Sequence, residues 1–275
     1  MSRGAAGPAG LEPVAVLALT VDLGNSRLKA VAWRSGGPSG PPRPGARFAL
    51  EPGEAVRPET WRARFAELAL SDPARMALST VASAQLGAAV AKALREAFGA
   101  PLADPPPHGL SLEVERAHTV GQARRFAARG AAALGRSAIV LDAGTALTVD
   151  AVALEPGGPA RFLGGAIAPG PSLLIKALAG GAARLFEVEL RPGARALGRQ
   201  TSEALEAGVV VGFRGAAFEL ARRVGLESGL ATAPRLLCGG AARFLLEPEP
   251  FWPGELIERP DLVHEGLLAA LGDLR

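Results

Sequence analysis

The sequence contains no tyrosine, one asparagine, one cysteine and three lysines among its 275 residues. Because the single cysteine, Cys238, cannot form an internal disulfide, a reducing, cytoplasmic location is expected. No apolar run approaches the ~20 residues that a bilayer-spanning helix needs. The short apolar run before Asp22 is followed by no cleavage-like site, so we expect neither a membrane span nor a signal peptide.

Charge of one sign is not concentrated anywhere in the chain. The net charge is +3 and the isoelectric point is about 9.7, which alone would favour a nucleic-acid partner. The 27 arginines are scattered, however, and form no stripe interleaved with aromatic residues, so a nucleic-acid partner is not expected. Apolar residues make up 48% of the chain, which predicts a packed core. Only residues 1–14, rich in Gly, Pro and Ala, are expected to form a disordered tail.

Two of the scarce residue types occur together. Lys, Asn and Tyr use AT-rich codons, so their scarcity is typical of a GC-rich genome. Against that bias Asn25, the only asparagine, lies four residues before Lys29. Asparagine is favoured in tight turns, which is the alternative explanation for its presence. The pairing with a lysine in one short loop favours a functional loop.

The hydrophobic pattern predicts an alternation of strands and helices. Strands are expected at 15–22, 27–34, 45–50, 75–81, 137–144, 146–154, 160–168, 234–240 and 255–259. Helices are expected at 58–70, 84–98, 121–135, 171–183, 201–223 and 263–272, with a short helix after residue 240. The proline-rich segment 100–109 is expected to be irregular, because proline lacks a backbone donor. Each half begins with a three-stranded meander, which predicts two similar α/β units with mixed sheets, 15–135 and 136–275, facing a common cleft.

Each predicted half carries one Asp-x-Gly loop between its first two strands. The first is Asp22-Leu-Gly-Asn-Ser26 and the second is Asp142-Ala-Gly-Thr-Ala146, with the two aspartates 120 residues apart. Glycine lets the backbone approach a ligand, and successive N–H groups in such a turn bind anions. The aspartate can hold Mg²⁺ beside bound phosphates, and Lys29 can reach a phosphate oxygen. One such loop is a weak signal for phosphate binding, but two at matching positions are a strong one.

Five further motifs follow these loops. They are GGAIAPG (Gly164–Gly170), GRQT (Gly198–Thr201), GVVVGFRG (Gly208–Gly215), CGG (Cys238–Gly240) and PDLVHEGL (Pro260–Leu267). In order and spacing the set resembles the type III pantothenate kinases over about residues 16–272. The paired loops are similar to those of the wider superfamily of acetate and sugar kinases, heat-shock chaperone ATPases and actin. The resemblance implies an α/β fold with two similar ribonuclease H-like (actin-like ATPase) domains, whose mixed sheets flank a nucleotide cleft.

The resemblance also implies an activity. The family phosphorylates pantothenate with ATP to give 4′-phosphopantothenate, the first step of coenzyme A biosynthesis. Its members require Mg²⁺ and a monovalent cation, either potassium or ammonium. They are homodimers, and here the dimerisation helices are expected in the second half of the chain.

Site residues are carried over position by position. The resemblance implies that the ATP-binding residues are Asp22, Leu23, Gly24, Asn25, Ser26, Arg27, Leu28, Lys29 and Thr145. It implies that the substrate-binding residues are Gly121, Gln122, Arg124 and Thr201. Asp142 matches the residue associated with the monovalent cation, and Asp22 is expected to hold Mg²⁺ and to take part in catalysis. For Thr201 the alternative is a helix-capping role together with Glu203, and for Gly164–Gly170 the alternative is a tight turn.

One position departs from the family. The family has Gly-x-Asp-Arg at the start of the helix before the second loop, and its aspartate accepts the proton of the pantothenate hydroxyl. This chain has Gly121-Gln-Ala-Arg124, so Ala123 stands where the proton acceptor is expected. His118, Glu115 and Asp22 are the candidates for that role. The chain also lacks the tyrosine that contacts pantothenate in the family.

Three functions remain open at this point. The first is an ATP-dependent pantothenate kinase, slowed by the loss of the base. The second is a catalytically inactive relative that acts as a regulatory or transcriptional accessory factor, similar to the Bvg accessory factor. The third is a phosphotransferase with a different small-molecule substrate. An assay for ATP-dependent phosphorylation of pantothenate separates them.

Overall fold

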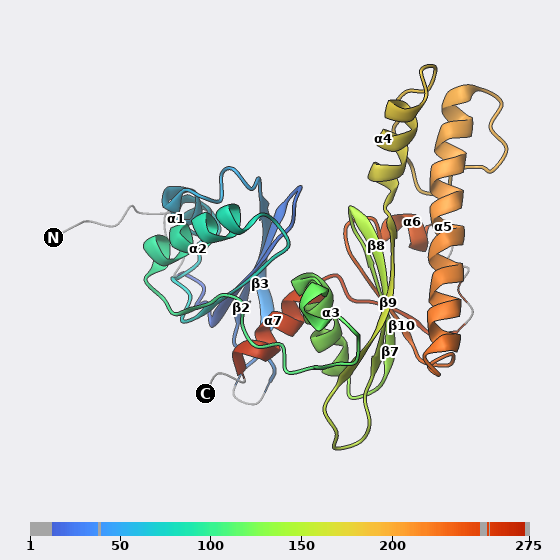
Figure 1. Ribbon diagram of the computed structural model, residues 1–275. Helices are drawn as coiled ribbons and strands as arrows, with labels where there is room; N and C mark the ends of the chain where they lie inside the picture. The colour runs from blue at the N-terminus through green and yellow to red at the C-terminus, as the bar shows by residue number, and fades with distance from the viewer. Residues whose placement is uncertain (1–12, 38–39, 248–251, 253, 273–275) are drawn as a thin grey trace. The chain divides into compact units, whose positions relative to one another are not determined.

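A computed structural model describes residues 13–37, 40–247, 252 and 254–272 of the chain (Figure 1). The chain divides into two compact units. Unit 1 comprises the described residues up to His108, residues Gly121–Phe126 and the residues from Val263 onward. Unit 2 comprises Gly109–Val120 and Ala127–Leu262. The predicted halves differ from these units, because the final helix belongs to unit 1 and most of the stretch between 109 and 135 belongs to unit 2.

Unit 1 is a five-stranded mixed sheet with helices packed on it. In the order β3-β2-β1-β4-β5, its strands are Arg43–Leu50, Leu28–Arg34, Ala18–Leu23, Met76–Thr80 and Leu102–Ala103. Its helices are α1 (Pro58–Glu67), α2 (Ala84–Phe98) and α7 (Leu262–Gly272). β1 pairs antiparallel with β2 and parallel with β4. One face of the sheet, with Leu19 and Val21, packs into a buried cluster that includes Trp61 of α1 and Leu94 of α2.

The final helix is held in unit 1 by a buried polar contact. Thr20 Oγ1 lies 3.0 Å from His264 Nδ1 and accepts a hydrogen bond from Trp33 Nε1 at 2.8 Å. The side chains of Thr20 and His264 are both buried. This network explains why α7 belongs with the first sheet, although it follows the second one in the sequence.

Unit 2 is a six-stranded mixed sheet. In the order β11-β10-β7-β8-β9-β6, its strands are Leu256–Glu258, Arg235–Cys238, Ala138–Ala143, Ala146–Ala153, Arg161–Pro169 and Ser111–Leu112. Its helices are η1 (Ala117–Thr119), α4 (Pro171–Gly181), α5 (Thr201–Glu227) and α6 (Arg243–Leu246), and α3 (Gln122–Ala132) is shared between the two units. The apolar face of β7 and β8 packs on α5 through Val210, Phe213 and Ala217. The first turns of α5 pack on α4 instead, and the two helices lie side by side in Figure 1.

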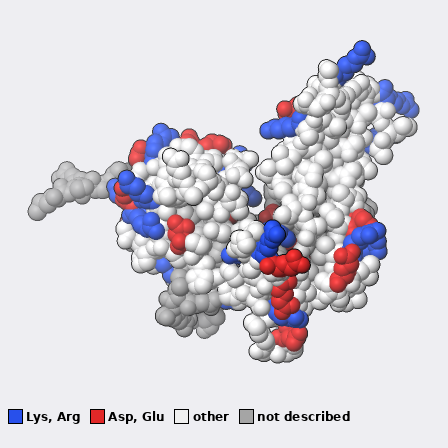
Figure 2. All heavy atoms as spheres, in the orientation of Figure 1, with Lys and Arg blue, Asp and Glu red and all other residues white. Residues whose placement is uncertain are grey.

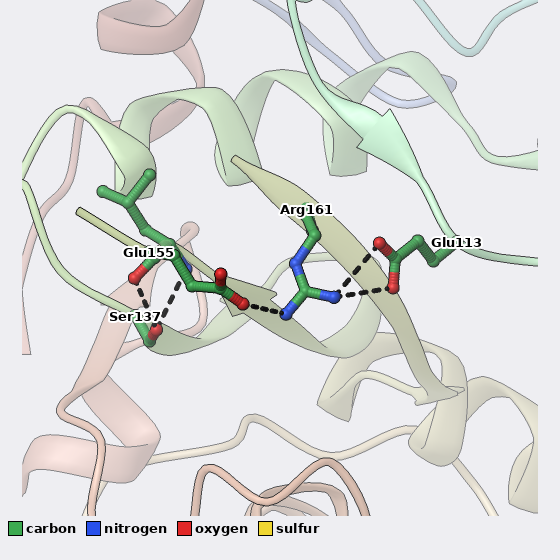
Figure 3. Close-up of polar contacts among 5 residues, drawn as sticks. Glu113, Ser137, Glu155 and Arg161 are labelled. Carbon is green, nitrogen blue, oxygen red and sulfur yellow. Dashed lines mark hydrogen bonds and ion pairs between the residues drawn. The ribbon is translucent and has the colours of Figure 1, made fainter. Parts of the chain in front are cut away.

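An ion-pair network ties the edge of this sheet together. Arg161 on β9 donates through Nη1 to both carboxylate oxygens of Glu113, at 3.1 and 3.2 Å, and through Nη2 to Glu155 at 2.9 Å (Figure 3). Glu113 follows β6, so Arg161 holds that short strand against β9. These side chains are exposed enough that their contribution to stability is small.

Most predicted elements are confirmed, with boundaries that shift by a few residues. The expectation of an irregular segment at 100–109 was wrong at one point, because Leu102–Ala103 pairs with β4 as β5. The sequence also missed β6. Both strands have only two residues, too few to show a periodic pattern. A disordered tail was expected at residues 1–14. Residues 1–12 of it lie outside the described residues, whereas Val14 forms a β-bridge with Leu70. Within the described residues, none of the helices has the length and apolar character of a membrane span.

Candidate active site

The first loop is the β1–β2 hairpin of unit 1. Gly24 N donates a hydrogen bond to Arg27 O at 3.1 Å, which closes a tight turn. A Cβ atom added at Gly24 would lie 3.0 Å from the same oxygen, so a larger residue would crowd the turn. Asn25, Ser26 and Arg27 are exposed at the tip, where their backbone groups are open to a ligand.

Polar side chains line up across three strands beside this loop. Asp22 on β1 is the register partner of Lys29 on β2 and of Ser79 on β4. Register partners on neighbouring strands point to the same face of a sheet. The buried apolar cluster lies on the opposite face of the sheet, so this row lies on the face that carries Thr20 and Trp33. A carboxylate, an exposed ammonium group and a hydroxyl therefore lie side by side at the end of the hairpin.

The start of α3 is anchored to the same sheet. Gln122 Oε1 accepts a hydrogen bond from the backbone N–H of Thr80 at 2.9 Å, at the end of β4. Thr80 is in turn the register partner of Leu23, the residue after Asp22. The Gly121–Arg124 motif therefore lies within unit 1 with the first loop, and Ala123 and Arg124 are half-buried there. Gln122 was expected to bind substrate. In the structure its side-chain amide oxygen anchors the helix to β4.

A histidine that the sequence analysis did not single out belongs to this unit. Burial, and to a lesser extent the positive charge of Arg125, lower the pKa of His108 from its ordinary value of 6.5. This shift favours the neutral imidazole, which is the form that accepts a proton. No motif signals it, because it ends the proline-rich segment. The candidates His118 and Glu115 are exposed and belong to unit 2, unlike Ala123.

The second loop is the β7–β8 hairpin of unit 2, and it is built in the same way. Gly144 N donates to Ala146 O at 2.9 Å. Gly170 N donates to Thr145 O at 2.9 Å, so the end of the GGAIAPG motif lies directly against the loop. A Cβ atom added at Gly170 would come within 3.0 Å of both Gly144 O and Thr145 O. The backbone is thus closely packed, and the Thr145 side chain is left exposed.

The CGG motif packs against the second aspartate. Gly239 has φ +92°, and a Cβ atom there would lie 2.5 Å from Asp142 Oδ1. Ala241 N donates to Ala143 O at 2.7 Å, which fixes this turn against β7. Asp142 is the register partner of Thr148 on β8 and of the buried Cys238 on β10, so a hydroxyl lies beside this aspartate as well. A Cβ atom at position 239 would therefore meet both the backbone of Ala143 and the carboxylate of Asp142.

Thr201 is the first residue of α5 and is exposed in unit 2. Glu203 closes the start of this helix, because its carboxylate accepts from Arg199 N at 2.8 Å and from Gln200 Nε2 at 3.0 Å. The first of these bonds, followed by the second, lowers the pKa of Glu203 from 4.5. The GRQT motif is therefore a helix start, and within the described residues the Thr201 hydroxyl makes no hydrogen bond.

Comparison with known proteins gives one family and one fold. A family model described as type III pantothenate kinase matches residues 18–223. A type III pantothenate kinase of Halorhodospira halophila is 36% identical over 259 residues, which span 91% of this chain and 96% of that relative. One of Thermomicrobium roseum is also 36% identical, over 59% of this chain and 60% of its own length.

Two solved structures are similar in fold. One, described as a Baf family transcriptional activator from Campylobacter jejuni, has a TM-score of 0.57 at 19% identity and covers 93% of this chain and 98% of its own. The other, described as a 2-dehydro-3-deoxygalactonokinase from Sinorhizobium meliloti, has a TM-score of 0.51 at 13% identity, over 93% of this chain and 96% of its own. These likenesses and the two mixed sheets confirm the predicted fold class.

Proposed function

The chain belongs to the type III pantothenate kinase family, and we propose that it transfers the γ-phosphoryl group of ATP to the 4′-hydroxyl of pantothenate. This reaction is the first step of coenzyme A biosynthesis. We place it in the reducing cytoplasm, because the only cysteine of the chain, Cys238, is buried and cannot form an internal disulfide. The observation that carries the proposal is the recurrence of one arrangement in both units. Each has a glycine-closed hairpin whose aspartate is in register with a hydroxyl-bearing residue on a neighbouring strand.

The residues of the first loop fit the triphosphate of ATP. The exposed turn at Asn25 and Ser26 offers backbone N–H groups to phosphate oxygens, and Lys29 adds a positive charge. Among the described residues, no group of three or more His, Cys, Asp and Glu side chains could hold a metal. Asp22 would therefore hold Mg²⁺ together with phosphate oxygens and water, as is usual at ATP sites. Bound Mg²⁺ neutralises phosphate charge during the transfer.

The second loop fits the remaining ligands. Thr145 is exposed at the tip and is proposed to contact ATP. Asp142 lies in a close-packed turn against Gly239, where one carboxylate and nearby backbone carbonyl groups suit a monovalent cation, potassium or ammonium. Thr201, exposed at the start of α5, remains a proposed substrate contact.

The chemical step needs a clamp and a proton acceptor. Arg124 can hold the pantothenate carboxylate through two parallel hydrogen bonds. The 4′-oxygen attacks the γ-phosphorus, the bond to the bridging oxygen breaks, and ADP leaves with that electron pair. The hydroxyl proton must pass to a base, and the methyl group of Ala123 cannot take it. A base contributes roughly 10²–10⁴-fold, but phosphoryl transfer depends mainly on positioning and electrostatics. The proposal is therefore a kinase with slow turnover.

The same proposal includes a homodimer formed through α4, α5 and the loop between them. Leu178 on α4, and Phe186 and Leu197 in the loop, are 39%, 49% and 78% exposed. The loop is fixed on α5, because Arg191 donates through its backbone and side chain to Glu206. In Figure 2 the middle of the surface over α4 and the first part of α5 is uncharged, with basic groups at its tip and sides. Exposed apolar side chains gathered on one pair of helices are typical of an interface.

A second candidate function rests on Ala123. A protein that binds nucleotide and pantothenate without transferring phosphate would keep the loops and Arg124 but not the base. Such a protein would act as a regulatory accessory factor through a partner.

A phosphorylation assay separates the two. Purified protein is incubated with ATP, Mg²⁺ and pantothenate, with potassium, ammonium or neither, and 4′-phosphopantothenate is detected by mass spectrometry. We expect product that depends on the monovalent cation and is abolished in Asp22→Asn. No product, together with no pantothenate binding by calorimetry, would contradict the kinase. Binding of both ligands without product would favour the accessory factor.

A further inference from the structure

Two buried hydroxyl groups have no hydrogen-bond partner among the described residues. They are Ser79 Oγ on β4 and Thr148 Oγ1 on β8. The Ser79 side chain is fully buried. Most buried polar groups in proteins are hydrogen-bonded, because leaving one unpaired costs free energy. A hydroxyl kept in such a position therefore calls for an explanation.

Each hydroxyl lies in register with the aspartate that begins the loop of its own unit, although on a different neighbouring strand. Ser79 is the register partner of Asp22, and Thr148 is the register partner of Asp142. Directly opposite residues on adjacent strands point to the same face, with Cβ atoms about 4.5–5.5 Å apart. Each hydroxyl is thus within side-chain reach of the aspartate that begins a phosphate loop.

Strand connectivity does not account for this coincidence. Thr148 lies in the hairpin that carries Asp142, on an antiparallel strand. Ser79 lies on a parallel strand that enters the sheet after α1, far from the first hairpin in sequence. Neighbouring hydroxyls in unit 1 do have partners. Thr80 Oγ1 accepts from Ala82 N at 3.1 Å, and Thr20 Oγ1 accepts from Trp33 Nε1.

We propose that Ser79 and Thr148 are positioning residues for Asp22 and Asp142. An ionised carboxylate is a hydrogen-bond acceptor only, and a hydroxyl is its natural donor. In the ligand-bound protein each hydroxyl donates to one oxygen of its aspartate, which leaves the other oxygen directed at the ligand. The ligand is Mg·ATP at Asp22 and the monovalent cation at Asp142. This inference rests on the proposed function, because it takes the ligands of the two loops from it.

The test separates a ligand-positioning role from a structural one. In Ser79→Ala we expect the dissociation constant for Mg·ATP, measured by calorimetry, to rise about tenfold, the value of one hydrogen bond to a charged group. In Thr148→Val we expect the increase in melting temperature that potassium gives the ATP-bound protein to be lost. Without ligands, both variants should melt at or above the wild-type temperature, because each removes an unpaired buried hydroxyl. Thr148→Ser keeps the donor and should restore the response to potassium.

Ser83→Ala is the matched control. Ser83 Oγ accepts from Leu86 N at 3.3 Å and caps α2, so its loss should lower the melting temperature and leave the affinity for Mg·ATP unchanged. Wild-type affinity in Ser79→Ala and a normal potassium response in Thr148→Val would overturn the inference. The inference would also be overturned if a variant that loses ligand binding already melts below the wild type in the absence of ligands, since the role of the hydroxyl would then be structural. A wild type that binds Mg·ATP but leaves pantothenate unphosphorylated contradicts the kinase alone, whereas one that binds no nucleotide contradicts both.

Discussion

At residue 123 the side chain is a methyl group on the first turn of α3, between Gln122, which anchors the helix to Thr80, and Arg124. If pantothenate and ATP bind as proposed, only the proton acceptor is absent. Ala123→Asp should then raise kcat roughly 10- to 10⁴-fold with little change in KM for ATP, because a base acts mainly in the transition state. Arg124 beside the new carboxylate favours its ionised form. Steady-state kinetics of the wild type and the variant measure the effect.

Ala123→Asn is the matched control for this gain. Asparagine has nearly the same shape as aspartate and cannot accept the proton, so its kcat should remain at the wild-type level. An equal gain in both variants would show that shape rather than basicity matters. An unchanged rate in Ala123→Asp from an active wild type would mean that another residue accepts the proton. His108, whose lowered pKa favours the neutral form and which belongs to the same unit, is then the residue to replace.

Gly239 gives a second prediction at this scale. A methyl group there would clash with Ala143 O and would lie 2.5 Å from Asp142 Oδ1, on a backbone with φ +92° that L-residues rarely adopt. Gly239→Ala should therefore displace the carboxylate, lower the melting temperature and abolish the response to potassium. Gly240→Ala is the control, because an added Cβ atom at that position meets nothing within 4 Å. Equal behaviour of the two variants in thermal melts with and without potassium would contradict this account of the turn.

At the scale of elements, the start of α5 depends on one carboxylate. Hydrogen bonds from Arg199 N and then Gln200 lower the pKa of Glu203 from 4.5. Because the folded-state pKa is the lower one, the stability that Glu203 contributes is complete above the unfolded pKa. It is lost as the pH falls through the folded-state pKa. Glu203→Ala should therefore melt a few degrees below wild type at pH 7, and the difference should disappear in acid.

Thermal melts from neutral pH to about pH 3 test this, since that range crosses the ordinary pKa of glutamate. Glu227, the last residue of the same helix, is the control. Glu227→Ala should show no such loss, because a negative charge at a helix C-terminus is not stabilising. A difference between wild type and Glu203→Ala that persists unchanged in acid would mean that the carboxylate charge is not what holds the helix start.

At the scale of the whole molecule, the apolar surface of α4 and its loop predicts the oligomeric state. Leu178→Glu combined with Phe186→Glu should convert the proposed dimer to a monomer, because two charges would be buried at the interface. Sedimentation at micromolar concentration measures the change. Leu226→Glu, at the opposite end of α5 and 56% exposed, should leave the dimer intact. A wild type that sediments as a monomer would contradict the prediction outright.

The sequence by itself determined the order of the elements and the two loops. Alternating apolar residues around Asp22 and Asp142, each followed by a glycine turn, are local signals, so the hairpins and their family resemblance could be read without coordinates. The departure of Ala123 from the Gly-x-Asp-Arg motif of the family was equally visible, since it needs only the motif. The two-residue strands β5 and β6 could not be predicted, because their pairing depends on partners elsewhere in the sheet.

Only the tertiary structure decided what surrounds the two aspartates. The structure brings together residues that are far apart in the sequence: Gly239 lies against Asp142, and Ser79 lies beside Asp22. It also places His264 against Thr20. The motif around His264 was visible, but its place in unit 1 was not. The physical reason is that register between strands is set by packing of the whole sheet. Side chains with no periodic or turn signal of their own, such as Ser79 and Thr148, acquire a role only through the strand that lies next to them.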